Sequence, residues 1–155
     1  TRLIFTAHSI PQEMSDKSGY AAQVEETAAA VSRLVGSSQV IGAAHRAADA
    51  NDSFDWVIGW QSRSGPPQQK WLEPDVLMRL EEAKAAGKTH AVVVPVGFLV
   101  DHVEVLYDLD VLAAAGARLQ GITMLRAATV GDHPKFVQML AELAGEKIES
   151  FYARS

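Results

Sequence analysis

The sequence contains no cysteine among its 155 residues. This absence excludes disulfide bonds, thiolate zinc sites and cysteine-ligated iron–sulfur clusters within the chain, and it suits a cytoplasmic location. Lysine and arginine (14 residues) are fewer than aspartate and glutamate (19 residues), which gives a formal net charge of -5. Because no basic cluster and no interleaving of aromatic with basic residues is present, we do not expect nucleic-acid binding.

Long apolar runs and nucleotide-binding loops are also missing. The longest apolar run is too short to cross a bilayer, and no signal peptide is visible, so we expect no transmembrane segment. No G-x-G-x-x-G or Walker loop follows an expected strand, which disfavours a generic nucleotide-binding domain. The chain opens directly on a strand without an initiator methionine, which predicts a processed or truncated amino terminus.

The sequence does contain regularly alternating strand-like and helix-like segments. Hydrophobic residues make up 48% of the chain and the mean hydropathy is +0.01, which is typical of one globular domain. The patterns predict strands at 3–7, 56–58, 90–97 and 122–127, helices at 20–35, 74–87, 101–117 and 132–148, and a loop at 11–19. The continuous apolarity of HAVVVPVG predicts burial on both faces, as in a parallel sheet. We therefore predict one doubly wound α/β domain, with a four-stranded parallel sheet and helices on both faces.

Ligands of such sheets bind beyond the carboxyl ends of the strands, so polar residues at these ends are the candidate site residues. His8 ends the first strand, and Asp101, Glu104 and Asp108 are spaced to lie along one face of the helix after the third strand. An imidazole that faces a carboxylate can hold a divalent cation such as Fe²⁺ or accept protons from a substrate nitrogen. A packing histidine and an acidic stripe that faces water explain the same residues without chemistry.

Other polar and aromatic residues are weaker candidates. Trp60 at the end of the second strand could stack on a flat ligand, and Arg63 either meets an anionic group or is simply exposed. Trp71 is expected to pin its loop into the core. For the remaining histidines we expect surface or capping roles (His45, His90 and His133) and a packing or orienting role (His102).

Four segments, in this order, resemble the ferrochelatase family, and in particular the carboxyl-terminal half of the bacterial enzymes. FTAHSIP resembles the histidine motif of the family, and GWQSRSGPPQQKWLEPDV its Gln-Ser-rich loop with the Trp-Leu-x-Pro signature. VPVGFLVDHVEVLYDLD resembles the acidic helix, and RAATVGDHPKFVQML the last strand and helix. The resemblance runs from about Leu3 to about Leu143.

This resemblance implies an enzyme that inserts Fe²⁺ into a porphyrin in haem synthesis, with coproporphyrin III as the expected substrate. Protoporphyrin IX is the alternative substrate, and a non-catalytic half that only binds porphyrin or metal is the alternative function. No cofactor is expected to be permanently bound, because Fe²⁺ is the substrate metal. The implied roles are metal ligation or proton acceptance for His8 and Glu104, an outer acidic path for Asp108 and Asp101, and substrate contact for Trp60, Gln61 and Ser62.

Two features depart from the family pattern. Leu112 stands where some members carry a further carboxylate, so a second metal site is not expected there. The chain, 1–155, corresponds to one chelatase-like domain, whereas family enzymes have two similar halves with the porphyrin between them. We therefore expect a missing amino-terminal half on the same chain, on a separate chain or as a homodimer mate, and we prefer the interpretation that the chain is a fragment.

Overall fold

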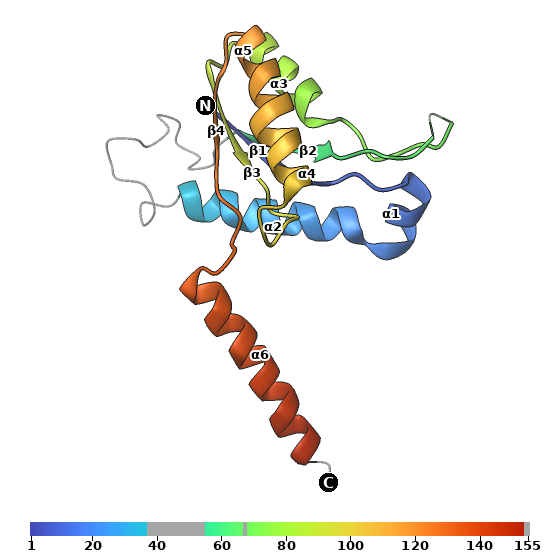
Figure 1. The fold of residues 1–155 in the computed structure, drawn as a ribbon, viewed down its shortest axis with the longest axis vertical. Coiled ribbons are helices and arrows are strands. Elements are labelled where there is room, and N and C mark those ends of the chain that lie inside the picture. Colours follow the sequence, from blue (N-terminus) through green and yellow to red (C-terminus); the bar gives the residue numbers. More distant parts are fainter. Residues whose placement is uncertain (37–54, 67, 154–155) are drawn as a thin grey trace.

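The computed structural model describes residues 1–36, 55–66 and 68–153 (Figure 1). Its centre is one sheet in which every strand pairs in parallel with its neighbours, in the order β2-β1-β3-β4. The strands are β1 (Arg2–His8), β2 (Trp56–Gln61), β3 (His90–Val94) and β4 (Thr123–Arg126). The prediction of a four-stranded parallel α/β sheet is thus confirmed.

The strand order places β1 next to the point where the sheet changes direction. From β1 the chain moves outward to β2 on one side, and then returns past β1 to β3 and β4 on the other. In doubly wound sheets, ligands bind at the carboxyl ends of the strands beside this switch point. The crevice between the ends of β1 and β3 is therefore the expected place for a site.

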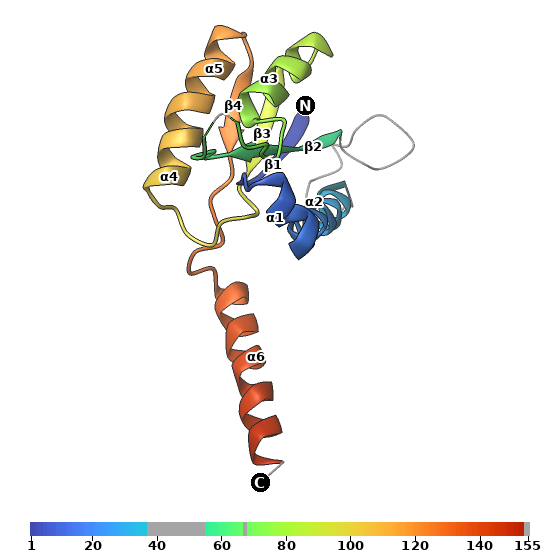
Figure 2. The same cartoon turned by 90° about the vertical axis from the view of Figure 1, so that its right-hand side faces the viewer.

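Helices cover both faces of the sheet (Figure 2). The helix α2 (Tyr20–Gly36) lies on one face, where its Ala28 packs with Leu3 and Phe5 of β1. On the other face lie α3 (Val76–Ala85) and a continuous helical stretch formed by α4 (Val103–Val105), η2 (Leu106–Ala113) and α5 (Ala114–Leu119). Since both faces are covered, the interior of β1 is buried.

Local sequence explains where α3 begins and ends. The side chain of Asp75 accepts a hydrogen bond of 2.8 Å from the backbone nitrogen of Met78 and so caps the first turn. Val76, Leu80 and Ala83 recur at helical spacing and are buried against the sheet. These contacts hold the start of α3 beside the end of β2.

Several predicted boundaries are wrong, and two of them have a clear local cause. The expected loop at 11–19 contains α1 (Gln12–Ser18), which ends at Gly19 with a φ of 65° and buries only Ser15, so that no apolar periodicity revealed it. The third strand ends at Val94 instead of position 97. Pro95 has no amide hydrogen to continue the ladder, and the amide of Gly97 instead donates to the carbonyl of Thr6.

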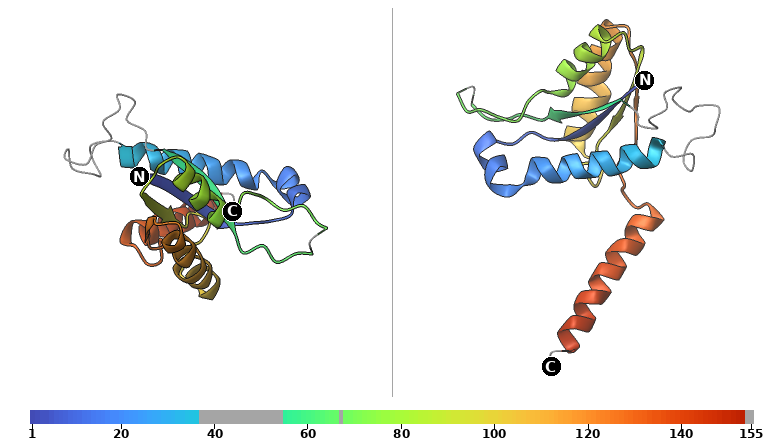
Figure 3. Two further views of the ribbon diagram at one scale, coloured as in Figure 1. Left: turned by 90° about the horizontal axis from the view of Figure 1, so that it is seen from above. Right: turned by 180° about the vertical axis from the view of Figure 1, so that it is seen from behind.

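The last helix, α6 (Pro134–Tyr152), begins two residues after the predicted start at position 132 and does not cover the sheet. It projects away from the domain when the molecule is seen from the front and from behind (Figures 1 and 3). None of its residues is buried, and its apolar side chains, such as Leu140 and Ile148, are about half exposed. Leu125 of β4, whose neighbour Met124 packs against the α3 side, is 61% exposed on the opposite face.

Candidate functional site

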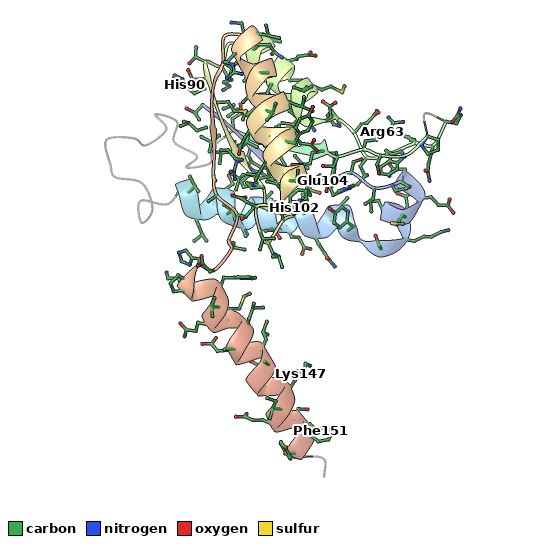
Figure 4. All side chains as sticks on the ribbon, viewed as in Figure 1. Arg63, His90, His102, Glu104, Lys147 and Phe151 are labelled. Atoms are coloured by element: carbon green, nitrogen blue, oxygen red, sulfur yellow. The ribbon has the colours of Figure 1, made fainter. Side chains whose placement is uncertain are left out.

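The structure brings His8 and Glu104 together at the switch point of the sheet. His8 is the last residue of β1, and Glu104 lies in the first turn of α4, after β3. The His8 Nε2 and Glu104 Oε1 atoms are 3.2 Å apart, and both side chains are partly exposed, at 33% and 40%. Figure 4 labels Glu104 at the start of its helix, near His102. Two residues 96 positions apart thus form the contact expected from the sequence.

A close backbone approach positions the loop that carries Glu104. The Gly97 amide donates a hydrogen bond of 3.0 Å to the Thr6 carbonyl. A Cβ atom on Gly97 would lie 2.5 Å from the Ala7 Cβ and 2.7 Å from its Cα, so a larger residue does not fit. The loop therefore rests directly on the residue before His8.

The hydrogen bonds of His8 determine the role of each ring nitrogen. Nδ1 lies 2.5 Å from the carbonyl oxygen of Ser9. Because a carbonyl can only accept, Nδ1 carries the hydrogen, and in a neutral ring Nε2 then presents its lone pair to the Glu104 carboxylate. Two lone pairs at 3.2 Å repel each other unless a proton or a metal ion lies between them. The geometry of the pair thus allows it to share a proton or to bind a metal ion.

Tyr20 supports the backbone of His8, a role that the sequence did not reveal. Its hydroxyl donates a hydrogen bond of 3.0 Å to the His8 carbonyl. Burial raises the pKa of Tyr20 above its ordinary value. The ring of Tyr20 also lies 5.8 Å from that of Trp60. Trp60 is only 6% exposed, so its contact with a substrate stays a prediction.

Ser62 and Asp108 form a second polar contact beside this pair. The Ser62 hydroxyl donates to the Asp108 carboxylate, and the backbone of Ser62 has a φ of 62°, a left-handed conformation that is uncommon for a residue with a side chain. Gln61 is 5% exposed, and its Oε1 atom has no partner among the described residues. These residues, with Trp60 and Leu112, line a cavity of about 320 Å³.

The acidic helix differs from the regular helix that the sequence predicted. It begins at Val103, so Asp101 precedes it, and from Leu106 to Ala113 it is a π-helix. The prediction that three carboxylates lie along one face of a regular helix is therefore wrong. The buried residues of this stretch repeat every four positions (Val105, Leu109, Ala113 and Ala117). This spacing is also that of an ordinary α-helix, in which residues four apart lie on one face.

Asp101 forms an ion pair with Arg126 at the end of β4, with an Nη1 to Oδ1 distance of 3.1 Å. Asp110, which the sequence analysis did not single out, binds the same guanidinium at 2.6 Å. The role of Asp101 in an outer acidic path stays a prediction.

The other sequence candidates have structural contacts. Arg63 pairs with Glu73 at 3.4 Å and remains partly exposed. His102 packs its ring against Phe98 at 5.4 Å, and His133 caps α6, as expected. His90 is exposed. The buried ring of Trp71 contacts Gly65, as its loop-pinning role predicted, and His45 lies outside the described residues.

Metal binding in the described part of the chain is limited to small ligand sets. No group of three or more histidine, aspartate or glutamate side chains comes together there as a metal site. His8 and Glu104 offer two ligands, a neutral imidazole and a carboxylate, which suit a borderline cation such as Fe²⁺. No helix within the described ranges is long and apolar enough to span a membrane.

Comparison with known proteins decides the family. The sequence matches the family described as Ferrochelatase over residues 1–148. The chain belongs to the ferrochelatase family. It is 45% identical over 149 residues to the ferrochelatase of Rhodopirellula baltica, and 44% identical over 149 residues to the coproporphyrin III ferrochelatase of Frankia alni.

The chain corresponds to only part of these ferrochelatases. The alignments include 96% and 93% of this chain but 38% and 36% of the respective relatives. The coproporphyrin III ferrochelatase of Nocardia farcinica is 40% identical over 99% of this chain and 41% of its own length. The chain thus spans about two fifths of the length of these ferrochelatases.

A solved structure supports the fold independently of close sequence similarity. A CbiX protein from Marinobacter aquaeolei VT8, described as a cobalamin (vitamin B12) biosynthesis protein, superposes with a TM-score of 0.60 at 17% identity. The match covers 96% of this chain and 98% of the CbiX chain. At this identity the likeness concerns the fold alone.

Proposed function

We propose that this chain is the metal-inserting half of a ferrochelatase, which inserts Fe²⁺ into a porphyrin during haem synthesis. The observation that carries the proposal is the contact between His8 Nε2 and Glu104 Oε1 at the switch point of the sheet. Coproporphyrin III is the preferred substrate, since several of the relatives are coproporphyrin III ferrochelatases. Protoporphyrin IX remains the alternative.

The chemistry requires proton acceptors. As Fe²⁺ binds the four nitrogens of the macrocycle, the two pyrrole N–H bonds break and both protons must leave. The lone pair of His8 Nε2 takes the two protons in turn, and the Glu104 carboxylate at 3.2 Å stabilises each of them until it leaves. Asp108, which accepts from Ser62, is the next carboxylate along the helix and carries protons outward. The same imidazole and carboxylate can bind the incoming metal before it enters the ring.

The cavity beside this pair is the proposed contact region for the substrate. Ser9, the neighbour of His8, lines it together with Gln61 and Ser62. The buried Gln61 Oε1, which lacks a partner among the described residues, is an available acceptor for a substrate group. Trp60 adds apolar surface to the same cavity.

We further propose that a second chelatase-like half completes the site. The apolar side of α6 and the exposed Leu125 lack cover in the part of the chain that the structure describes, and Figure 4 shows no other element alongside α6. Exposed apolar surface of this extent is typical of an interface. The second half belongs to the same chain, to a separate chain or to a homodimer mate. The cytoplasmic location expected from the sequence stays a prediction.

An insertion assay tests this function. Fe²⁺ insertion into coproporphyrin III is measured for the chain alone and for the chain combined with an amino-terminal ferrochelatase half, which we call the complemented enzyme. We expect insertion by the complemented enzyme. Porphyrin binding without insertion by either sample would instead support a non-catalytic binding half. Thermal stabilisation by a nucleotide but not by porphyrin would contradict both.

A further inference from the structure

Arg126 is the centre of an ionic cluster at the carboxyl end of β4. Its Nε and Nη2 atoms donate to the two carboxylate oxygens of Asp110 at 2.6 and 3.0 Å. Nη1 and Nη2 also donate to Asp101, at distances of 3.1 to 3.3 Å, and Nη1 donates to the Ala127 carbonyl at 3.2 Å. Every nitrogen of the guanidinium is therefore engaged.

The two carboxylates of this cluster flank the residues of the proposed site in the sequence. Asp101 lies just before α4, and Asp110 lies within η2. Glu104 and Asp108 are between them, on the same helical stretch. Arg126 thus attaches this stretch to the sheet on both sides of its two site residues.

The cluster supplies a constraint that apolar packing does not. The helical stretch contacts the sheet side through Val105, Leu109 and Ala113, and such contacts are not directional. It also changes from α to π geometry after Val105, which alters the relation between residues before and after that point. A planar fork that binds Asp110 through two parallel hydrogen bonds, and Asp101 as well, fixes both parts in one arrangement.

The exposure of the carboxylates favours a positioning role of the Arg126 cluster over a role in folding stability. The side chain of Arg126 is 15% exposed, but those of Asp101 and Asp110 are 33% and 40% exposed. Ion pairs with carboxylates this open to water contribute little to folding. The hydrogen bonds that Arg126 donates to Asp110 raise its pKa above the ordinary value. Partial burial opposes this change and Asp101 adds to it, so the guanidinium keeps its charge.

We propose that Arg126 is a positioning residue, which holds Glu104 and Asp108 in register with His8 through its bonds to Asp101 and Asp110. This inference rests on the proposed function, because Glu104 and Asp108 are the residues to which that function assigns proton and metal handling. The positioning itself is inferred from the ionic cluster alone. A substitution of Arg126 should therefore disturb the contact between His8 and Glu104 without unfolding the chain.

The first test measures the coupling between His8 and Glu104 by NMR of the His8 ring in this chain. Glu104→Gln should shift the ring signals when Arg126 is intact, because it alters the group that faces Nε2. In an Arg126→Gln background the same change should produce at most half of that shift. Arg126→Lys, which keeps the charge but not the fork, should give an intermediate value. Arg118→Gln removes an exposed arginine on the same stretch and should leave the full shift.

The second test measures binding of Zn²⁺ alone by calorimetry. Arg126→Gln should weaken binding about tenfold, yet it should have no further effect when Glu104→Gln is already present, because coupled residues are not additive. Asp110→Asn removes the negative charge and one of the two acceptor oxygens that the guanidinium binds, and it should act in the same direction if Arg126→Gln does not fold. A purely structural role would lower the unfolding temperature and leave the coupling unchanged, which would overturn the inference.

The two tests separate this inference from the proposed function. If the wild-type chain bound no Zn²⁺ while the NMR coupling depended on Arg126, the metal role of the pair would fail and the positioning role would stand. If Zn²⁺ bound through His8 and Glu104 but neither readout responded to Arg126, the positioning role would fail alone.

Discussion

Gly97 offers a direct test of how the site is assembled. A methyl group at this position would lie 2.5 Å from the Ala7 Cβ and 2.7 Å from the Ala7 Cα. This is about 1 Å short of the ~3.5 Å at which carbon atoms pack favourably. Since one of the opposing atoms belongs to the backbone of β1, the loop itself has to move. We therefore expect Gly97→Ala to displace the loop that carries Glu104.

The size of the effect follows from this overlap. Overpacking of this kind costs about 1–3 kcal/mol. For a chain of this length, each kcal/mol lowers the unfolding temperature by about 2–4 °C. A displacement of about 1 Å at a reacting group can reduce the rate about 100-fold. The insertion rate should therefore fall by a larger factor than the folded fraction of the protein does.

Two measurements on the same preparation check this prediction. Thermal unfolding gives the folded fraction, and Fe²⁺ insertion by the complemented enzyme gives the rate per folded molecule. Gly145→Ala is the matched control, because a Cβ there meets nothing within 4 Å, and it should stabilise α6 by about 0.5–1 kcal/mol. Wild-type stability and rate for Gly97→Ala would refute the argument that close approach at Ala7 positions Glu104.

Two further predictions concern stability. Tyr20→Phe removes the hydrogen bond to the His8 carbonyl and should cost about 1 kcal/mol in urea unfolding; an unchanged midpoint would show that this bond contributes nothing. Burial alone would raise the pKa of Asp55, but hydrogen bonds and charges from Lys88 and Arg2 outweigh it and lower the pKa. The stabilisation is therefore present above the unfolded-state pKa and is lost as the pH falls through the folded-state value. Asp55→Asn should lower the unfolding temperature at pH 7, and the difference should shrink as the pH falls below the ordinary aspartate pKa; a pH-independent difference would contradict this assignment.

The sheet could be predicted because its sequence signal is local and redundant. Apolar and polar residues do not alternate in the run at His90–Val94. Such a continuous apolar run is typical of a strand that is covered on both faces. Parallel strands then need crossover helices, and the remaining apolar periodicities supplied them. The same logic put His8 at the edge where ligands bind, and so part of the site followed from the fold class.

The contact between His8 and Glu104 could only be inferred as a possibility from the sequence. The two residues are 96 positions apart, and their meeting depends on the strand order and on the fit of Gly97 against Ala7. The cluster around Arg126 was missed for the same reason. An arginine at the end of a strand carries no local sign that two carboxylates from another element will reach it.

Two helical features were hidden for other physical reasons. The π-helix could not be predicted, because its buried side chains repeat every four positions, as they do in an ordinary α-helix. The helix α6 has a clear apolar side, which predicted a helix packed on a core. Apolar periodicity indicates that one face of a helix packs against an apolar surface, but it does not identify that surface.

The most direct test of the central claim is Fe²⁺ insertion by the complemented enzyme carrying His8→Ala or Glu104→Gln. Removal of a proton acceptor in the reacting position should lower the insertion rate by about 10²–10⁴-fold. His90→Ala, which removes an exposed histidine from the start of β3, should retain the wild-type rate. Insertion at the full rate by both His8→Ala and Glu104→Gln would contradict the assignment of this pair as the centre of the site.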